Sequence, residues 1–565
     1  MPDCPFNPAA ENIADLIYRF GSLQSERWNN TSSLCADYVS SDYIILHMPL
    51  TPDAVSMRVH PYYMIPSLFS PLDYNAMEAS GILSAFNSPA LNNQGKGVLI
   101  GLVDTGIDYR SPLFQNPDGT TRIAGIWDQS VPIEEDVLPA GVPDYYPMGG
   151  SSYGTEYTRE QINEALASDD PLSLVPTQDT IGHGTFLAGL AAGSSIPQED
   201  FTGAAPEAEL AVVKLKPAKK YLRDFYLIPS DAPAFQENDI MMGIKYLRMM
   251  ADRLKKPLVI LLAMGSNSGS HIGTSPLSQV TQNYSGFFGI ITVIAGGNET
   301  GAAHHFYASI PAGTEYEDVE IRVGKEEAER GFVLELWAAD ADTYTVGFIS
   351  PSGERISRIP IIANNETSIP FLLDATTITV NYQLIEAESG SQLIFMRFQT
   401  PAAGIWTVRV YNTQRFKGTF HMWLPVQGMI SEETVFLRPD PYSTITVPGN
   451  SRLPITVGAY DTSTGGIYIH SSRGFTPNQI VKPELAAPGV NILGPSVGRK
   501  PGSDTPMTTR TGTSAAAAIT AGAAANLLGW GIVEGNYPTM SEASVKSYLI
   551  RGAQRNPALT YPNRE

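Results

Sequence analysis

Three side chains that can together perform nucleophilic catalysis lie far apart in this sequence, each within two residues of a glycine. They are Asp104, His183 and Ser514. A serine hydroxyl is a weak nucleophile near neutral pH, so it needs a base within hydrogen-bonding distance, and that base needs an acceptor that fixes its tautomer. We expect His183 to be the base and Asp104 the acceptor. The three residues therefore predict acyl transfer at Ser514, such as the hydrolysis of a peptide bond.

Such a reaction develops negative charge on the carbonyl oxygen, and Asn298 carries an amide that can donate a hydrogen bond to it. Asn298 ends the glycine-containing segment 295–298, and a donor of this kind is worth about 10²–10³ in rate. Taken singly, an aspartate before Thr-Gly or an asparagine after Gly-Gly is usually a turn residue, and His-Gly-Thr or Gly-Thr-Ser is usually a helix start or a loop. Their occurrence together, in this order, favours the catalytic interpretation.

Other polar residues of the sequence favour structural interpretations. His304 and His305 are adjacent, but no companion ligands at metal spacing accompany them, so we expect a surface loop and predict no metal and no cofactor. The lysine pair that begins at Lys219 is expected to be solvated. The chain has two cysteines, Cys4 and Cys35. A bridge between them is open as an alternative, but two free thiols in a reducing compartment are favoured.

The three catalytic residues lie at the ends of elements that can bring them together. Asp104 follows an apolar run, 95–103, which is typical of a parallel strand buried on both faces. His183 and Ser514 each begin a helix-like stretch of small residues, where free amides and the helix dipole favour negative charge. Further strand-like runs are 210–215, 258–263, 289–295 and 455–459, and a further helix-like stretch is 239–254. This alternation predicts an α/β fold with a parallel sheet flanked by helices.

The periodicity of the sequence divides the chain into three units. Residues 1–75 are typical of a small α+β unit. Between 314 and 443 the pattern changes to alternating apolar and polar residues with polar turns, which predicts an antiparallel β-sandwich. We therefore expect an α/β domain formed by 76–313 and 444–565, with the sandwich inserted between its two parts.

Length and charge limit the classes of protein that this chain can represent. At 565 residues it is too long for one compact core. The net charge of -20 argues against nucleic-acid binding, because phosphate contacts need clustered Lys and Arg. The N-terminus shows no secretory signal, and no apolar run reaches the length of a membrane span, so we expect synthesis in the cytoplasm.

The catalytic segments resemble those of the subtilisin-like (S8) serine proteases, in which the acid, the histidine and the serine follow in this order. Further similarity lies in 88–95, 471–474 and 482–490. The resemblance covers about 76–310 and 445–530. It implies a serine endopeptidase that acts on protein or peptide substrates.

A narrower resemblance is to the Csp-type germination proteases of clostridia. It rests on 97–109, 265–271 and 518–522 and on the inserted sandwich. That family has a prodomain that acts as chaperone and inhibitor, a jelly-roll insertion, and an activity directed at the zymogen of a spore cortex hydrolase. The resemblance therefore implies that 1–75 is a prodomain removed by self-cleavage, that the insertion is jelly-roll-like, and that the protein is associated with spores.

The resemblance also assigns contacts with the substrate. It implies self-cleavage near Asn75 and Ala76. By this resemblance, one segment would pair with the substrate as a strand; it is Ala263-Met264-Gly265. A second segment would form a wall of the S1 pocket; it is Ala295-Gly296-Gly297. Ala515 and Ala518 stand where most subtilases have a methionine and a proline. Small residues still pack there, so the assignment of the nucleophile is unchanged.

Two alternatives to a germination protease stay open. The Csp group includes members that have lost triad residues, so a pseudoprotease that works as a signalling or binding module is the alternative to an active enzyme. The presence of all four predicted catalytic residues argues against it. A subtilase with no role in spores is the other alternative, because substrate choice depends on pocket shape and partner contacts rather than on the catalytic motifs.

Overall fold

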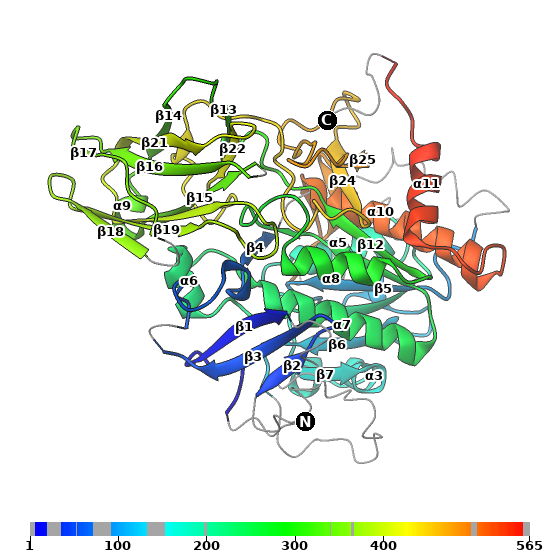
Figure 1. Cartoon of the computed structure of the whole chain (residues 1–565). Helices are drawn as coiled ribbons and strands as arrows, with labels where there is room; N and C mark the ends of the chain where they lie inside the picture. Colours follow the sequence, from blue (N-terminus) through cyan, green and yellow to red (C-terminus); the bar gives the residue numbers. More distant parts are fainter. Residues whose placement is uncertain are drawn as a thin grey trace.

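The computed structural model describes residues 6–19, 35–51, 54–71, 92–132, 153–196, 201–339, 341–362, 366–498 and 506–557. These residues form an α/β domain, a β-sandwich beside it and a small N-terminal unit that packs against both (Figure 1). The predicted fold class, a parallel sheet flanked by helices with an inserted antiparallel sandwich, is confirmed.

An eight-stranded sheet forms the centre of the α/β domain. Its strands, in spatial order, are β25 (Leu485–Pro488), β24 (Ile455–Tyr460), β12 (Ile290–Ala295), β10 (Leu258–Leu262), β5 (Leu99–Asp104), β8 (Glu209–Lys214), β6 (Ile123–Asp128) and β7 (Thr155–Thr158). Neighbouring strands are parallel except β6 and β7. Because β5, β10 and β12 are buried along their whole length, they appear in the sequence as unbroken apolar runs.

Helices cover both faces of this sheet. On one face lie α5 (His183–Ala192) and α10 (Thr513–Leu528), and on the other lie α7 (Glu237–Leu254) and α8 (Pro276–Ser285). Alternate residues of β5 contribute to the two hydrophobic clusters, as the period of two in a strand requires. The remaining helices are α3 (Arg159–Leu166), α4 (Pro171–Leu174), α6 (Lys220–Tyr226), α9 (Glu327–Arg330) and α11 (Glu542–Gly552).

Helix α10 lies in the centre of the domain because its residues are small. A Cβ atom added to Gly522 would lie only 2.4 Å from the Cβ of Ala204, so any larger residue there would push the helix away. Within the described part of the chain, Thr513–Val533 is the one helix long and apolar enough to cross a membrane by length and composition, and 72% of its most apolar window is buried inside the protein. A core helix has the same properties, so this is weak support for a membrane span.

The sandwich consists of two antiparallel sheets with a common hydrophobic core. The six-stranded sheet contains β13 (His305–Ser309), β22 (Thr419–Trp423), β15 (Phe332–Ala338), β20 (Leu393–Gln399), β19 (Thr376–Gln383) and β18 (Glu366–Phe371), and the five-stranded sheet contains β17 (Arg355–Ile356), β16 (Thr343–Ile349), β21 (Gly404–Gln414), β14 (Tyr316–Val323) and β23 (Val435–Phe436). Its first strand, β13, precedes residue 314. Phe332 and Trp406 lie in the shared core, whereas Trp337 faces a second cluster that the sandwich shares with the N-terminal unit and α6.

The N-terminal unit contains an antiparallel sheet of β1 (Ile13–Arg19), β3 (Tyr43–Pro49) and β2 (Ala36–Tyr38), in that spatial order. The sheet packs on the face of the central sheet that α7 and α8 cover. Cys35 is disulfide-bonded, so the expectation of two free thiols is wrong. The only other cysteine of the sequence, Cys4, lies outside the described residues.

Three short pairs of strands complete the structure. β26 (Ile492–Pro495) and β27 (Met507–Arg510) form an antiparallel pair before α10. β4 (Leu68–Pro71), which follows the N-terminal sheet in sequence, lies between β11 (Met264–Gly265) and β9 (Phe235–Gln236) and pairs with each in the antiparallel direction. The N-terminal part of the chain therefore contacts the α/β domain in two ways, through strand pairing by β4 and through the packing of side chains.

Candidate active site

The predicted catalytic residues lie at the ends of three elements of the α/β domain. Asp104 is the last residue of β5, His183 the first of α5, and Ser514 the second of α10. All three are buried, with exposed fractions of 2%, 1% and 0%. Helices α5 and α10 pack directly against each other on one face of the sheet. The fold therefore brings together the elements that carry these three residues.

Asp104 holds the imidazole of His183 in a defined tautomer. Oδ1 of Asp104 lies 2.7 Å from Nδ1 of His183, and it also accepts a hydrogen bond of 2.7 Å from the backbone nitrogen of Thr105. A carboxylate can only accept, so Nδ1 carries the proton and Nε2 is the basic nitrogen of the ring. This is the arrangement that a general base requires.

A buried carboxylate that the sequence analysis missed joins the strand of Asp104 to the helix of His183. Oδ1 of Asp179 accepts hydrogen bonds from the hydroxyl of Thr105 (2.9 Å) and the backbone nitrogen of Gly182 (2.7 Å), while Oδ2 accepts from the backbone nitrogen (2.9 Å) and hydroxyl (2.8 Å) of Thr185. The same Thr105 hydroxyl accepts a bond from the backbone nitrogen of Gly184. The signal in the sequence was an acid just before the N-terminus of a helix, where a carboxylate is stabilised.

Asn298 and Ser514 are held close together by bonds through Thr513. The backbone nitrogen of Thr513 donates to Oδ1 of Asn298 at 3.1 Å, and the backbone nitrogen of Gly297 donates to the Thr513 hydroxyl at 3.1 Å. Because Oδ1 is the accepting end of the amide, Nδ2 is the end that can donate to an oxyanion. The Oγ of Ser514 is buried and has no hydrogen-bond partner among the described residues.

The predicted substrate-pairing strand is already paired in this structure. Ala263 lies between β10 and β11, Gly265 faces Ser70 of β4, and Met264 faces Pro71. On its other edge β4 pairs with β9. The chain's own N-terminal segment is thus the middle strand of a three-stranded sheet, with the antiparallel pairing by which a peptide adds to an edge.

The predicted S1 wall follows directly from the end of β12. Ala295 is the last residue of that strand, and the backbone nitrogen of Gly296 donates to the carbonyl of Val457. Gly297 has a φ of 106°, and a Cβ on it would lie 2.7 Å from the Cγ2 of Thr446. Only glycine fits at this position. Asn75 and Ala76, the predicted self-cleavage site, lie outside the described residues, so this position stays a prediction.

The histidine pair is buried, which corrects the expectation of a surface loop. His304 and His305 are 3% and 2% exposed. Nε2 of His305 lies 2.9 Å from Nδ1 of His421, and its ring stacks on Trp423. Both partners belong to β22, which is far away in sequence. Within the described residues, no group of three or more His, Cys, Asp or Glu side chains could hold a metal ion.

A buried carboxylate next to Asn298 connects the α/β domain to the sandwich. Glu299 is 2% exposed. Its Oε2 accepts hydrogen bonds of 3.0 Å from Nδ2 of Asn267 and from Nδ1 of His304, and its Oε1 accepts one from the backbone nitrogen of Gln427. Nε2 of Gln427 in turn donates to the carbonyl of Asn298. The segment that carries Asn298 is therefore bonded to the loop that follows β22.

Lys219 is also buried, which corrects its expected solvation. Its Nζ lies 2.7 Å from Oδ2 of Asp15 and donates to the carbonyls of Pro8 and Ile13 in the N-terminal unit. Burial lowers the pKa of Lys219, and the neighbouring Asp15 opposes this only in part. The pKa of Asp15 is held below its ordinary value, because the positive charge of Lys219 and the hydrogen bond to His47 outweigh burial.

Comparisons with known proteins agree with this geometry. The profile of the subtilase family matches residues 95–350 and 438–564. The chain is 24% identical to subtilisin-like protease SBT3.12 of Arabidopsis thaliana over 84% of its own length, and 23% identical to SBT3.5 of the same plant over 89%. These alignments cover 59% and 64% of the two plant proteins, so the chain spans about three fifths of their length.

A solved structure shows a similarity of fold over most of the chain. The CspB protease of Clostridium perfringens is 30% identical, with a TM-score of 0.73 over 86% of this chain and 93% of that one. This likeness confirms the expected resemblance to the Csp type. Because the family profile covers well over half of the sequence, including all four predicted catalytic residues, the chain belongs to the subtilase family of serine proteases.

Proposed function

We propose that this protein is a serine endopeptidase whose nucleophile is Ser514. Nε2 of His183 takes the proton of the serine hydroxyl as the oxygen attacks the carbonyl carbon of a peptide bond. Asp104 stabilises the imidazolium that forms, and Nδ2 of Asn298 donates to the oxyanion of the tetrahedral intermediate. His183 then gives its proton to the leaving amine, and water hydrolyses the acyl-enzyme by the same steps in reverse order.

The observation that carries this proposal is the 2.7 Å contact between Asp104 and His183 at the N-terminus of α5, beside helix α10, whose second residue is Ser514. The Ser514 hydroxyl is buried without a partner among the described residues, and a role as the nucleophile would account for this costly arrangement. Membership of the subtilase family supports the same reaction.

The first substrate that we propose is the chain itself. Strand β4 enters the α/β domain paired with Gly265, as a peptide substrate would. Residues 1–75 would then be the prodomain, cut near Asn75 and Ala76, that assists folding and inhibits the cleft. We further propose, from the likeness to the Csp type, that the mature enzyme activates a zymogen such as a spore cortex hydrolase, after synthesis in the cytoplasm and in association with the spore.

One observation favours a second function. The pairing of β4 with β11 also blocks the substrate-binding edge to other peptides. A pseudoprotease that binds its partners through other parts of its surface would retain this pairing. In that case the N-terminal unit stays attached as a permanent part of a signalling or binding module.

The intact masses of the purified wild-type chain and of Ser514→Ala separate these functions. We expect the wild type to be split near Asn75 and Ser514→Ala to remain whole, because loss of the nucleophile reduces turnover on the order of 10⁶-fold. Ser463→Ala, which alters an exposed serine of the loop 461–466 after β24, is the control and should be split normally. A wild-type chain that remains whole would contradict self-cleavage and favour the binding module.

A further inference from the structure

Two neighbouring side chains of β4 contact two different domains. Phe69 lies in the hydrophobic cluster of the α/β domain, with Met264 and residues of α7 and α8. Leu68, one residue earlier, lies in the cluster that includes α6 and the sandwich. Successive side chains of a strand point to opposite sides, so an extended peptide in this position presents alternate residues to the two domains.

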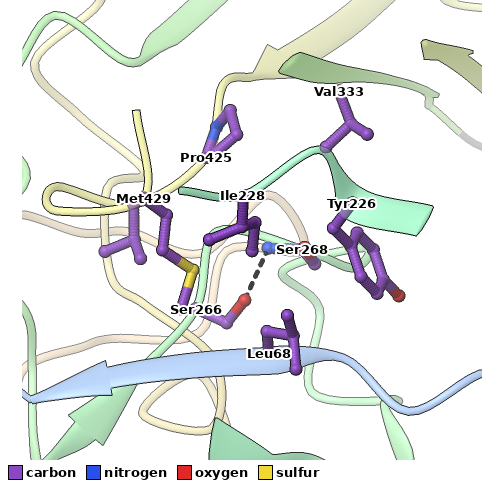
Figure 2. Close-up of a pocket in the computed structure, with 9 residues that line it drawn as sticks. Leu68, Tyr226, Ile228, Ser266, Ser268, Val333, Pro425 and Met429 are labelled. Atoms are coloured by element: carbon purple, nitrogen blue, oxygen red, sulfur yellow. Dashed lines mark hydrogen bonds between the residues drawn. The ribbon is translucent and has the colours of Figure 1, made fainter. Parts of the chain in front are cut away.

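Leu68 fits into a small, mostly apolar pocket at the junction with the sandwich, whose lining also includes Ser266 and Ser268. Figure 2 shows its side chain below Ile228, with Tyr226 on one side and Met429 on the other. Val333 of β15 and Val426 complete the apolar wall, and Leu68 itself is only 2% exposed. A cavity of about 10 Å³ remains beside it, comparable to the space that one water molecule needs. The pocket therefore matches a side chain of the size of leucine.

Leu68 is the one described residue of the N-terminal unit that lines this pocket. Apart from Leu68, its lining comes from residues between Tyr226 and Met429, all of which lie after the proposed self-cleavage site. The sandwich wall is also fixed to the substrate-pairing segment, because the backbone nitrogen of Gly269 donates to Oε2 of Glu335 at 2.9 Å. The pocket is thus part of the enzyme that would meet other substrates.

We propose that this pocket is a substrate subsite built jointly by the α/β domain and the inserted sandwich. The pocket takes an apolar side chain of the size of leucine. In a bound substrate this side chain belongs to the residue that lies two positions before the residue paired with Gly265, as Leu68 lies two positions before Ser70 here. The occupant is an extended segment of a protein substrate, which adds to β11 as β4 does here and replaces Leu68 by its own side chain. This inference rests on the proposed function and adds to it a requirement on the sequence of the substrate.

The chemistry of the pocket explains why it would select its occupant. Transfer of a leucine side chain from water into an apolar site is favourable, because it removes apolar surface from water. A serine at the same position would gain little of this and would lose hydration of its hydroxyl. The rate of cleavage should therefore depend on which residue the substrate carries at this one position, although the position is far from the bond that is cut.

Competition between two synthetic peptides tests the subsite. Both carry the sequence of residues 62–82, one with leucine and the other with serine at the position of Leu68, and both are mixed with the processed protein in one tube. Mass spectrometry then follows the two sets of products. The ratio of the initial rates equals the ratio of kcat/KM and does not depend on how much of the enzyme is free. We expect the leucine peptide to be cut at least about 10-fold faster.

A matched pair of variants assigns the preference to the pocket. Val333→Thr places a hydroxyl in the sandwich wall without changing its shape, and we expect the leucine-to-serine ratio to fall by at least about 3-fold, since a buried hydroxyl without a partner disfavours an apolar neighbour. Val346→Thr makes the same change in the interior of the sandwich, where Val346 is fully buried, and should leave the ratio unchanged.

The outcomes separate the two levels of the argument. Equal cleavage of the two peptides would overturn the subsite and leave the peptidase assignment intact. A ratio that changes equally in Val333→Thr and Val346→Thr would also overturn it, because the preference would then follow sandwich stability rather than pocket chemistry. Failure to cut either peptide, in a preparation where Ser514→Ala behaves like the wild type, would instead overturn the proposed function and the subsite with it.

Discussion

Asn298 differs from the other predicted catalytic residues because its side chain has two ends with separate tasks. Oδ1 accepts from the backbone of Thr513, next to the proposed nucleophile, and Nδ2 is the end that would donate to the oxyanion. The sequence could indicate Asn298 only by its place after two glycines. The bond that orients its amide depends on residues more than 200 positions away and could not be predicted.

Asn298→Ala should reduce kcat while leaving the fold intact. Removal of one oxyanion donor costs about 10²–10³ in rate, because charge that develops in the transition state loses its stabilisation. The measurement is kcat on a cleavable peptide together with the midpoint of thermal unfolding. Asn283→Ala, at an exposed position of α8, is the control. An unchanged kcat would remove Asn298 from the oxyanion hole.

At the scale of elements, the strand end that carries Asp104 and the helix start that carries His183 are joined by one carboxylate, that of Asp179. Four hydrogen bonds from Thr105, Gly182 and Thr185 converge on its two oxygens. These bonds fix the distance between β5 and α5, and therefore the contact between the imidazole and its acceptor. Asp179 is a positioning residue, since it acts on the reaction through other residues.

Asp179→Asn should lower kcat about 10- to 100-fold with little change in KM, because an amide nitrogen would face two of the donors and shift His183. Steady-state kinetics on a cleavable peptide measures both constants. Glu327→Gln is the control: Glu327 is a buried acid of the sandwich that accepts bonds from Ser431 and Thr434, so its loss affects stability alone. If Asp179→Asn alters only the unfolding midpoint, as the control does, the positioning role is wrong.

Several central elements of the α/β domain could be predicted because each of them has a strong local pattern. Strands such as β10 are short apolar runs, and α10 consists mostly of small residues. Burial selects these residue types, so each element can be recognised from its own residues. The position of β4 could not be predicted, since a strand of four residues has little pattern of its own and pairs with Gly265 and Phe235 across large separations. Lys219 was misjudged for the same reason: its partner, Asp15, is in another unit.

At the scale of the whole molecule, an ionic network joins the N-terminal unit to the α/β domain. His47 of β3 bonds to Asp15 of β1 through Nδ1 (2.8 Å) and to Asp37 of β2 through Nε2 (3.2 Å), and Asp15 also contacts Lys219. Burial alone would lower the pKa of His47. The hydrogen bonds and negative charges of the two aspartates outweigh burial and raise this pKa to about 9.

The stability of the uncut chain should therefore fall as the pH rises from about 6.5 to 9. The folded chain keeps the proton on His47 over this range and the unfolded chain loses it, so the stabilisation is complete below the unfolded pKa and is lost as pH passes the folded pKa. The shift of His47 is worth about 3 kcal/mol. Thermal unfolding of Ser514→Ala at pH 6.5 and 9 measures the effect, which His47→Gln should reduce.

His421→Gln supplies the control for this experiment. Burial lowers the pKa of His421 well below its ordinary value, so this residue stays neutral between pH 6.5 and 9. Its substitution should leave the slope of stability against pH unchanged. Equal slopes in the parent chain and in His47→Gln would contradict the role of the network.

The bonds of Glu299 bear on the modularity of this protein. The sandwich is inserted between the two parts of the α/β domain. This arrangement suggests that the sandwich could be deleted and the two parts of the α/β domain joined directly. Excision of the sandwich would remove Gln427, one of the three donors to the Glu299 carboxylate, and would leave this buried acid, one residue from Asn298, with fewer hydrogen bonds. A minimal version of this protein should therefore retain the sandwich or replace Glu299.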